Sequence, residues 1–373
     1  MKSKIQLVLI LVILVSITTT CQQQSKYDGE VKVEYTPYHV NLIRPIIDPE
    51  RIYQMSLDEK RFVHLPAEMK KMENLRELHL TDLKVKDWEK SADAINSFKK
   101  LNTLFINYNH FDELPFNPVN LKNLEMLYLS YSDGFNLGQE VKKLSRLKKL
   151  NTLGLAGIDI DSLPKEIFTL KTLRRIQVGE HENFNYSHGF TLLSDMTELE
   201  RLDIIFSNLK PLPKSFQKLK QLKKLGMYHC QVDLNLLFSI ISKWEKLEFL
   251  ELGEMNIKKL PKELTQLTAL KEINLNDNPN LDHQALFKQL SEIPGLEELV
   301  ISKTILHHQH DRFVMPEELA ELNNLKRLDM ATSQNIVFDS LFDVLVQLPK
   351  LEYLNLYRCT SDGYIVQFPD VLD

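Results

Sequence analysis

Glycine and cysteine are both scarce in this chain, which has 11 Gly and 3 Cys among its 373 residues. Neither G-x-G-x-x-G nor G-x-x-x-x-G-K-[ST] occurs, so the sequence contains no glycine-rich loop that could cradle the phosphates of a nucleotide. An excess of positive charge is also missing, because 46 Lys and Arg face 51 Asp and Glu, a formal charge of -5. Nucleic-acid binding needs a basic surface that neutralises phosphates, so nucleic acid is not an expected partner.

Recognisable catalytic motifs are missing as well. No H-E-x-x-H string occurs, and no Ser/His/Asp set can be picked out from the sequence. After the segment 1–20, no stretch is long and apolar enough to cross a membrane as a helix. We therefore expect neither catalysis nor a cofactor.

The segment 1–20 has the pattern of an export signal. Lys2 and Lys4 precede an apolar run at 5–17, which is too short for a transmembrane helix but suits the core of a secretory signal peptide. Cys21 and the polar residues 22–25 follow, an order that resembles the bacterial lipoprotein signal, in which such a cysteine becomes the lipid-modified N-terminus. Thr stands in two places where that signal usually has Leu and a small residue. Lipid modification of Cys21 is therefore one hypothesis, and a plain cleaved signal is the other.

An internal repeat dominates the rest of the chain. The pattern L-x-x-L-x-L, with Ile, Met, Phe or Val allowed, recurs at spacings that alternate between 23 and 26 residues, apart from single spacings of 25 and 29. Extra residues at 307–312 account for the longest spacing. The thirteen units resemble the leucine-rich-repeat family over residues 52–373. They begin at Ile52, Leu75, Leu101, Leu124, Leu150, Leu173, Leu199, Leu222, Leu247, Leu270, Leu296, Leu325 and Leu351.

The spacing of the leucines has a physical reason. Alternate side chains of a strand point to opposite faces, so the second and third leucines of a unit, such as Leu104 and Ile106, enter the core together. Short units continue with Leu-Pro, as at Leu163-Pro164, where proline marks the corner to the convex side. Long units instead have helical spacing, as at 236–244. The fold expected is an α/β leucine-rich-repeat solenoid, a curved horseshoe with a parallel β-sheet on the concave face and helices and irregular Leu-Pro turns on the convex face.

The ninth position of each unit, counted from its first leucine, lies where the chain leaves the strand. In the leucine-rich-repeat family it is often Asn, Cys, Ser or Thr, whose side chain hydrogen-bonds to backbone groups at the turn. Cys230 and Cys359 occupy this position, so we expect both to be buried and, five units apart, not to form a disulfide. We expect looser turns in four units that depart from the pattern, with Leu83, Ile158, His181 and Met255 there. The other polar residues at this position are Asn109, Ser132, Ser207, Asn278, Thr304 and Ser333.

Two flanking regions differ from the repeats. Residues 21–51 contain no repeat and mix apolar residues with prolines, so we expect a polar tether followed by an irregular N-terminal cap. No four-cysteine capping module occurs. At the other end, the last strand, near Leu354 and Leu356, is expected to be an open sheet edge of the kind that invites pairing. The oligomeric state therefore stays open.

We expect a ligand on the concave sheet, which is lined by positions 3, 5, 7 and 8 of each unit. Between about residues 101 and 230, aromatic side chains flank a strip of very small residues at Gly154, Ala156 and Gly157. Exposed aromatic groups give large contact areas at low entropic cost. The alternative is that these rings only pack against one another across strands. The predicted ligand-binding residues are Phe105, Asn107, Tyr108, Tyr128, Tyr131, Phe206, Tyr228 and His229.

Two further features are weaker candidates. Glu251, Glu254 and Asp277 make the next part of the concave face acidic, but acidic residues on an exposed sheet are more often simply solvated. The segment 307–311 holds three His and one Asp, types that bind Zn²⁺ or Cu²⁺. A flexible loop does not fix ligand geometry, so we expect a solvated loop and no metal.

The function expected from the sequence is a non-enzymatic binding module that recognises a protein, peptide or glycan. Its expected location is the cell envelope, at the outer membrane or cell surface through a lipid on Cys21, with secretion as the alternative. Two other interpretations are a repeat-bearing effector linked to an enzyme and a structural spacer. The first needs a catalytic domain, for which no residues are left outside the repeats.

Overall fold

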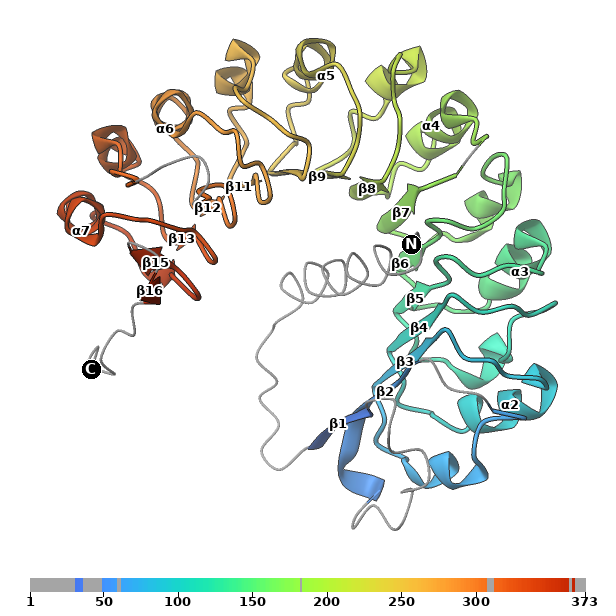
Figure 1. Cartoon of the computed structure of the whole chain (residues 1–373). Helices are drawn as coiled ribbons and strands as arrows, with labels where there is room; N and C mark the ends of the chain where they lie inside the picture. Colours follow the sequence, from blue (N-terminus) through green and yellow to red (C-terminus); the bar gives the residue numbers. More distant parts are fainter. Residues whose placement is uncertain are drawn as a thin grey trace, which may run out of the picture.

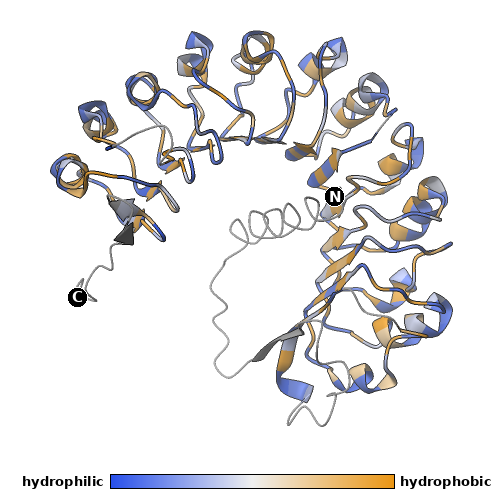
Figure 2. Ribbon diagram, in the orientation of Figure 1, coloured by the Kyte–Doolittle hydropathy of each residue, from blue (hydrophilic) through white to orange (hydrophobic). Residues whose placement is uncertain are grey.

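The computed structural model describes residues 31–35, 49–58, 62–181, 183–306, 312–361 and 364–365. These residues form an arc in which one continuous sheet lines the inner side and helices cover the outer side (Figure 1). Apolar residues recur in the strands and in the helices of successive turns (Figure 2). The predicted α/β horseshoe is confirmed, with the sheet on the concave face.

Two of the predictions concern residues outside these ranges. Cys21, with the signal segment before it, lies outside the described residues, and so does the histidine-rich segment 307–311. A search of the described helices finds none with the length and apolar character needed to span a membrane.

The sheet has 14 strands, which are parallel and follow one another in sequence order. Each of the thirteen predicted units contributes one strand, and the additional strand β1 lies before them. The strands are β1 (Val31–Tyr35), β2 (Ile52–Asp58), β3 (Glu77–Thr81), β4 (Thr103–Asn107), β5 (Met126–Tyr128), β6 (Thr152–Gly154), β7 (Arg175–Gly179), β8 (Arg201–Ile205), β9 (Lys224–Tyr228), β10 (Phe249–Gly253), β11 (Glu272–Asn274), β12 (Glu298–Val300), β13 (Arg327–Asp329) and β14 (Tyr353–Asn355). A separate antiparallel pair follows, β15 (Thr360–Ser361) and β16 (Tyr364–Ile365).

Strand β1 differs from the expectation of an irregular cap. It pairs in parallel with β2, and Val33 lies opposite Met55. The alternation of Val31, Val33 and Tyr35 along the sequence fits a strand, but one alternating stretch without a leucine pattern does not indicate membership of the repeat. Pairing with β2 gives the backbone of this segment hydrogen-bond partners at the end of the sheet.

Two kinds of helix alternate on the convex side. The long units contain α2 (Trp88–Ile95), α3 (Leu137–Leu144), α4 (Tyr186–Ser194), α5 (Leu234–Ile241), α6 (His283–Ser291) and α7 (Phe338–Leu345). The short units contain the 3-10 helices η3 (Ala67–Lys71), η4 (Pro118–Asn120), η5 (Lys165–Thr169), η6 (Lys214–Lys218), η7 (Lys262–Gln266) and η8 (Glu317–Glu321), and η2 (Pro49–Arg51) precedes β2. The register follows this alternation, since Glu77 pairs with Thr103 across the longer connection through α2, and Thr103 pairs with Met126 across the shorter one through η4.

Local sequence explains where these helices begin. Five of the six described α-helices start after an Asp or Asn whose side chain accepts a hydrogen bond from the backbone three residues later, as Asp233 does from Leu236 before α5. Most of the 3-10 helices follow proline directly, as η5 follows Pro164. The helix η4 is different: it begins three residues after Pro115, where Asn117 caps it instead.

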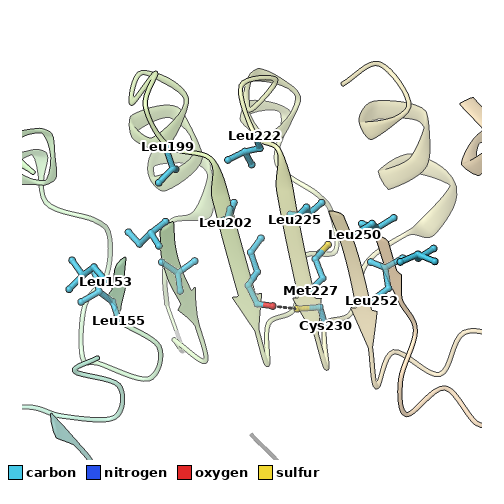
Figure 3. Packing of buried hydrophobic residues seen from close by; sticks show 14 of the residues in the cluster. Leu153, Leu155, Leu199, Leu202, Leu222, Leu225, Met227, Cys230, Leu250 and Leu252 are labelled. Atoms are coloured by element: carbon cyan, nitrogen blue, oxygen red, sulfur yellow. Dashed lines mark hydrogen bonds between the residues drawn. The ribbon is translucent and has the colours of Figure 1, made fainter. Parts of the chain in front are cut away.

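The core is a single apolar layer between the sheet and the helices. Strand side chains such as Leu153, Leu202 and Leu225 are fully buried and stack from one unit to the next (Figure 3). A unit alone cannot bury this layer, so each repeat depends on its neighbours for most of its stability. The five phenylalanines Phe98, Phe190, Phe216, Phe238 and Phe287 add bulk from the convex side.

In several units the position-9 side chain closes the turn through buried hydrogen bonds to the backbone of the preceding unit, as at Asn109, Ser132, Cys230, Asn278 and Cys359. The side-chain nitrogen of Asn278 donates to the carbonyl of Leu252 in the preceding unit at 2.7 Å, and its oxygen accepts from the amide of Ile257 at 2.9 Å. Cys230 Sγ donates to the carbonyl of Ile204 at 3.3 Å (Figure 3). Burial raises the pKa of the Cys230 thiol to about 12, which keeps the donor proton in place. The predicted burial of both turn cysteines is confirmed, and both are free.

The units without a polar residue at position 9 are supported by the unit that follows. Asn109 Oδ1 accepts from the amide of Leu83, and Asn278 Oδ1 accepts from the amide of Met255. In the same way a ring nitrogen of His181 contacts the carbonyl of Ile158 at 2.9 Å. Because the longer side chain reaches back by one unit, the turns at Leu83, Ile158 and Met255 are held by hydrogen bonds, and the expectation of looser turns is wrong for these three.

Position 8 has a left-handed backbone in each described unit from β3 to β14. The φ angle lies between 47° and 68° at Asp82, Tyr108, Tyr131, Gly157, Glu180, Phe206, His229, Glu254, Asp277, Lys303, Thr332 and Arg358. Such angles cost non-glycine residues roughly 1 kcal/mol each. The turn persists because it directs the position-9 side chain into the core, where burial of the side chain and, in most units, its hydrogen bonds offset that cost.

Substitution of Asn278 tests the importance of the buried hydrogen bonds between units. Asn278→Leu is expected to lower the free energy of unfolding by about 3 kcal/mol or more, since buried backbone groups of Leu252, Met255 and Ile257 lose their partner. Urea denaturation followed by circular dichroism measures the change.

Cys230→Ser is the matched control at the same position. Serine already stands there in other units, such as those of Ser132 and Ser207, so this variant is expected to lie within about 1 kcal/mol of the wild type. An Asn278→Leu protein as stable as the control would contradict the role assigned to position 9.

Candidate functional site

The eight predicted ligand-binding residues all lie at the concave face, but in two separate groups. Phe105, Asn107 and Tyr108 belong to β4 and its end, and Tyr128 and Tyr131 to β5 and its end. The second group, Phe206, Tyr228 and His229, lies at β8 and β9, three strands further along.

Position 5 of the first group forms a stack of rings across neighbouring strands. The Phe105 and Tyr128 rings are 4.6 Å apart and nearly parallel, and His79 stacks on the other side of Phe105 at 4.2 Å. The next residue in this row is Gly154, and a Cβ there would come within 2.2 Å of the Tyr128 ring. The glycine therefore makes room for Tyr128 to lean across the neighbouring strand.

Position 8 repeats this arrangement at the ends of the strands. The Tyr108 and Tyr131 rings stack at 4.3 Å, and the next residue, Gly157, leaves room for the Tyr131 ring as Gly154 does for Tyr128. The hydroxyl of Tyr131 donates to a carboxylate oxygen of Glu180, one unit beyond the glycine. Burial and the Glu180 contact together raise the pKa of Tyr131, so this hydroxyl stays protonated and acts as a donor.

The second group is packed less regularly. Phe206 meets the Tyr228 ring edge-on at 5.8 Å and lies 5.0 Å from the His229 ring. A nitrogen of His229 lies 3.5 Å from a carboxylate oxygen of Glu254. Gly253 follows Tyr228 in its row, as Gly154 follows Tyr128 in the first group.

Exposure divides the eight residues. Phe105, Tyr128 and Tyr228 are buried, which follows the cross-strand packing considered as the alternative for these rings. His229 is exposed. The remaining four are half-buried and keep part of their side chains at the surface, namely Asn107, Tyr108, Tyr131 and Phe206.

Between and beyond these groups, the concave face carries a network of opposite charges. Arg175 and Arg201 both donate to the buried carboxylate of Asp203, at 2.6 and 2.9 Å. Burial alone would raise the pKa of Asp203, but the two arginines outweigh it and hold the pKa below its usual value. Arg201 also lies 3.6 Å from Glu251, across Gly226, where a Cβ would meet Asp203 at 2.4 Å.

Glu251 is the less well compensated acid of this network. Burial raises the pKa of Glu251 to about 7, since the nearby cations Arg201 and Arg175 are shared with Asp203, whose charge adds to the shift. Part of the Glu251 population is therefore protonated near neutral pH. The acidic character predicted for this part of the face is weaker than the sequence indicates.

A hollow of about 640 Å³ lies on the concave face over β8 to β14. Its walls combine cations, acids and rings: Arg201 lies over the Phe249 ring at 4.7 Å, and Lys303 pairs with Asp277 at 3.3 Å. None of the eight predicted residues lines it. The lining residues are Arg201, Lys224, Phe249, Glu272, Asn274, Asn276, Asp277, Glu298, Val300, Ser302, Lys303, Arg327, Asp329, Ala331, Thr332, Asn355, Tyr357 and Arg358.

Two carboxyl groups that line the hollow, those of Glu272 and Asp277, have raised pKa values. Burial, and after it the nearby Glu298, raise the pKa of Glu272. Burial also raises the pKa of Asp277, although Lys303 offsets part of the effect. A cation brought by a ligand would relieve both carboxylates.

The face on which the hollow lies could be predicted from the sequence. Its residues occupy positions 3, 5, 7 and 8 of the last seven units, so the alignment of the repeats places them on the concave face. The signal is the mixture of charges there, which contrasts with the aromatic first units. The depth of the hollow was not predictable, because it depends on side-chain lengths in several adjacent strands.

Metal binding has no candidate in the part of the chain that the structure describes. No group of three or more His, Cys, Asp or Glu side chains is close enough there to hold an ion.

The pKa of Glu251 leads to a prediction for stability. Because it lies above the unfolded value of about 4.5, ionisation of Glu251 costs folding energy, and that cost grows as the pH rises from about 4.5 to about 7. Glu251→Gln is expected to gain up to about 2 kcal/mol relative to the wild type between pH 5 and pH 8. Urea denaturation of both proteins across that range measures the difference, and a stability difference that does not change with pH would contradict the assignment.

No protein-family model matches this chain, and a search of curated proteins finds no match. Among solved structures, an internalin from Listeria monocytogenes is 19% identical with a TM-score of 0.43, over 83% of this chain and 88% of the internalin. A leucine-rich-repeat protein from Leptospira interrogans is 18% identical with a TM-score of 0.39, over 83% of this chain and 86% of its own. By its own repeat pattern and its ladder of parallel strands, this chain is a leucine-rich-repeat solenoid.

Proposed function

We propose that this chain is a non-enzymatic binding module that recognises a protein, peptide or glycan through its concave sheet. The observation that carries the proposal is the hollow over β8 to β14, where charged and aromatic side chains converge on one open space. Concave sites with a few positioned polar groups are the usual form of ligand sites in proteins.

The groups in the hollow are held in place before any ligand arrives. Asp329 accepts hydrogen bonds from Ser302 at 2.6 Å and from Asn355 at 2.9 Å, and it lies 3.5 Å from Arg327. Preorganised groups lose little freedom on binding, which favours affinity. Since acids and cations alternate in the hollow, the surface best matched to it also carries both signs of charge, as a protein or peptide does.

The aromatic residues at the ends of β4, β5, β8 and β9 extend this site along the same sheet. In the proposal, Tyr108, Tyr131, Phe206 and His229 contact the ligand together with Asn107, because these five keep exposed surface. Of the buried rings, Tyr228 packs edge-on against Phe206, and Phe105 and Tyr128 stack on each other in the row at position 5. A ligand long enough to cover both parts would follow the concave face from β4 to β14.

We also propose that the protein acts in the cell envelope, anchored at the outer membrane or cell surface by a lipid on Cys21, with secretion as the alternative. The support is the sequence of the segment 1–25, in which a basic start and a short apolar run lead to Cys21 and a polar tether. A binding face that acts on a macromolecular partner outside the cell fits such a location.

A photo-crosslinking amino acid at Asn274, inside the hollow, tests the binding face. Incubated with the envelope fraction of the native host, this protein is expected to give discrete crosslinked products, detected by mass shift on a gel. The same label at Val346, an exposed residue after α7, is the control and is expected to give none. Crosslinks from Val346 but not from Asn274 would contradict the proposal. The absence of a discrete product from either site would also contradict it, and this is the result that a spacer role predicts.

Two sets of substitutions then divide the face. Affinity for the crosslinked partner is then measured with two variants, and each is expected to bind at least about tenfold more weakly than the wild type. The aromatic variant combines Tyr108→Ser, Tyr131→Ser and Phe206→Ser. The charge variant combines Lys303→Ala and Arg327→Ala. Lys262→Ala with Lys288→Ala, on the convex helices η7 and α6, is the control. If the aromatic variant keeps the wild-type affinity and circular dichroism spectrum, the aromatic residues do not belong to the binding site.

Substitution of Cys21 tests the anchor. In cells fed a radioactive fatty acid, the wild-type protein is expected to incorporate label and to sediment with membranes, whereas Cys21→Ala incorporates none and is lost from that fraction. Equal labelling of the two proteins would exclude Cys21 as the lipid site.

A further inference from the structure

One edge of the solenoid carries an unbalanced row of lysines. All strands of the sheet are parallel, so the two-residue turns that precede them gather along the same edge. Before β4 to β7 these turns are Lys99-Lys100, Lys122-Asn123, Lys148-Lys149 and Lys171-Thr172. Their six lysines are exposed, and no acidic residue belongs to these turns. We refer to them as the basic edge.

The lysines of the basic edge that make hydrogen bonds in the described structure bond to neutral groups. Lys100 and Lys149 donate to the side-chain oxygens of Asn74 and Asn123, at 2.5 and 2.8 Å. Two others donate to backbone carbonyls of their own loops. These contacts orient the lysines and leave their charge uncompensated.

Elsewhere the turns of the same edge carry at most one lysine each: Lys220 and Lys350 are single lysines in their turns, and Glu198 stands in the turn before β8. Further along, Lys223 pairs with Glu200 at 2.8 Å and Lys271 with Glu248 at 3.1 Å. The turns at 268–269, 294–295 and 323–324 contain no charged residue. A run of adjacent turns that each carry lysine and no acid therefore occurs in the N-terminal half of the arc.

We propose that the basic edge docks this protein on the anionic headgroups of a phospholipid bilayer. Each lysine close to such a surface contributes roughly 1 kcal/mol of attraction. Neighbouring turns in the row are one strand spacing apart, about 4.8 Å. Six cations on four adjacent turns therefore meet a layer of phosphates together and within the reach of their electrostatic attraction.

The placement of the basic edge favours a bilayer over a soluble polyanion. The lysines follow an outer edge of the solenoid, whereas the hollow that could surround a linear chain is on the concave face of β8 to β14. The edge also lies in the N-terminal half of the arc, and the lipid anchor is proposed at the N-terminal side of the repeats. A single acyl chain binds membranes only weakly, and a basic surface is a common second attachment. The inference does not depend on the ligand proposed for the concave face.

Vesicle binding by the full chain tests this inference. The basic-edge variant has Lys99→Gln, Lys122→Gln, Lys148→Gln and Lys171→Gln, one change in each turn. The control has Lys210→Gln, Lys258→Gln, Lys262→Gln and Lys288→Gln, four exposed lysines elsewhere with the same change in net charge. Co-sedimentation is measured with phosphatidylcholine vesicles that contain or lack phosphatidylglycerol. The N-terminal segment is the same in all three proteins, and its own contribution is given by the vesicles without phosphatidylglycerol.

Phosphatidylglycerol is expected to strengthen binding of the wild type and the control at least about tenfold, and to have little effect on the basic-edge variant. Raising the salt from about 0.1 M to about 1 M is expected to remove the difference, because screening shortens the range of the attraction. Equal binding of the two variants, or no effect of phosphatidylglycerol on the wild type, would overturn the proposal. It would also be overturned if a soluble heparin fragment bound the wild type as tightly as the vesicles do and lost that binding in the basic-edge variant.

Discussion

The hydrogen bond that a buried side chain at the end of one strand makes to the backbone of the preceding unit is the interaction on which this solenoid depends. Apolar stacking supplies most of the stabilisation, but it does not by itself fix how far each unit is rotated or shifted against the next. The position-9 side chains that reach the preceding unit do so, because their donors and acceptors are satisfied only in one register, as for Asn109 and Asn278. A buried polar group without a partner is costly, so this register is strongly favoured.

That requirement explains the unusual backbone at position 8. A left-handed residue in each described unit from β3 onward is a property of the architecture, and at Tyr108, Tyr131, Phe206 and His229 it is no sign of function. It nevertheless has a consequence for the surface. Side chains at position 8 leave the strand in a common direction, and so the rings of adjacent units meet face to face, as Tyr108 and Tyr131 do.

The same geometry governs what a concave parallel sheet can present. Neighbouring strands are about 4.8 Å apart, close to the separation of stacked rings, so aromatic residues in one row pack on each other and lose exposed surface. Charged residues in a row behave differently. They form networks such as that of Arg175, Arg201 and Asp203 where the signs match, and keep a raised pKa where they do not, as at Glu251 and Glu272. The part of the concave face that carries long side chains of both charges is therefore more open than the part that carries stacked rings.

The sequence by itself determined the solenoid, the thirteen strands from β2 to β14 and the role of Cys230 and Cys359, because each follows from a periodic pattern that only stacked units can satisfy. It placed Phe105, Tyr128 and the other candidates on the correct face for the same reason. Only the tertiary structure decided which of them are exposed, where the hollow lies and which lysines share an edge. Those properties depend on side chains from different units, which are distant along the chain and adjacent in the sheet. Their packing and their combined charge arise between units, so the sequence of a single repeat does not reveal them.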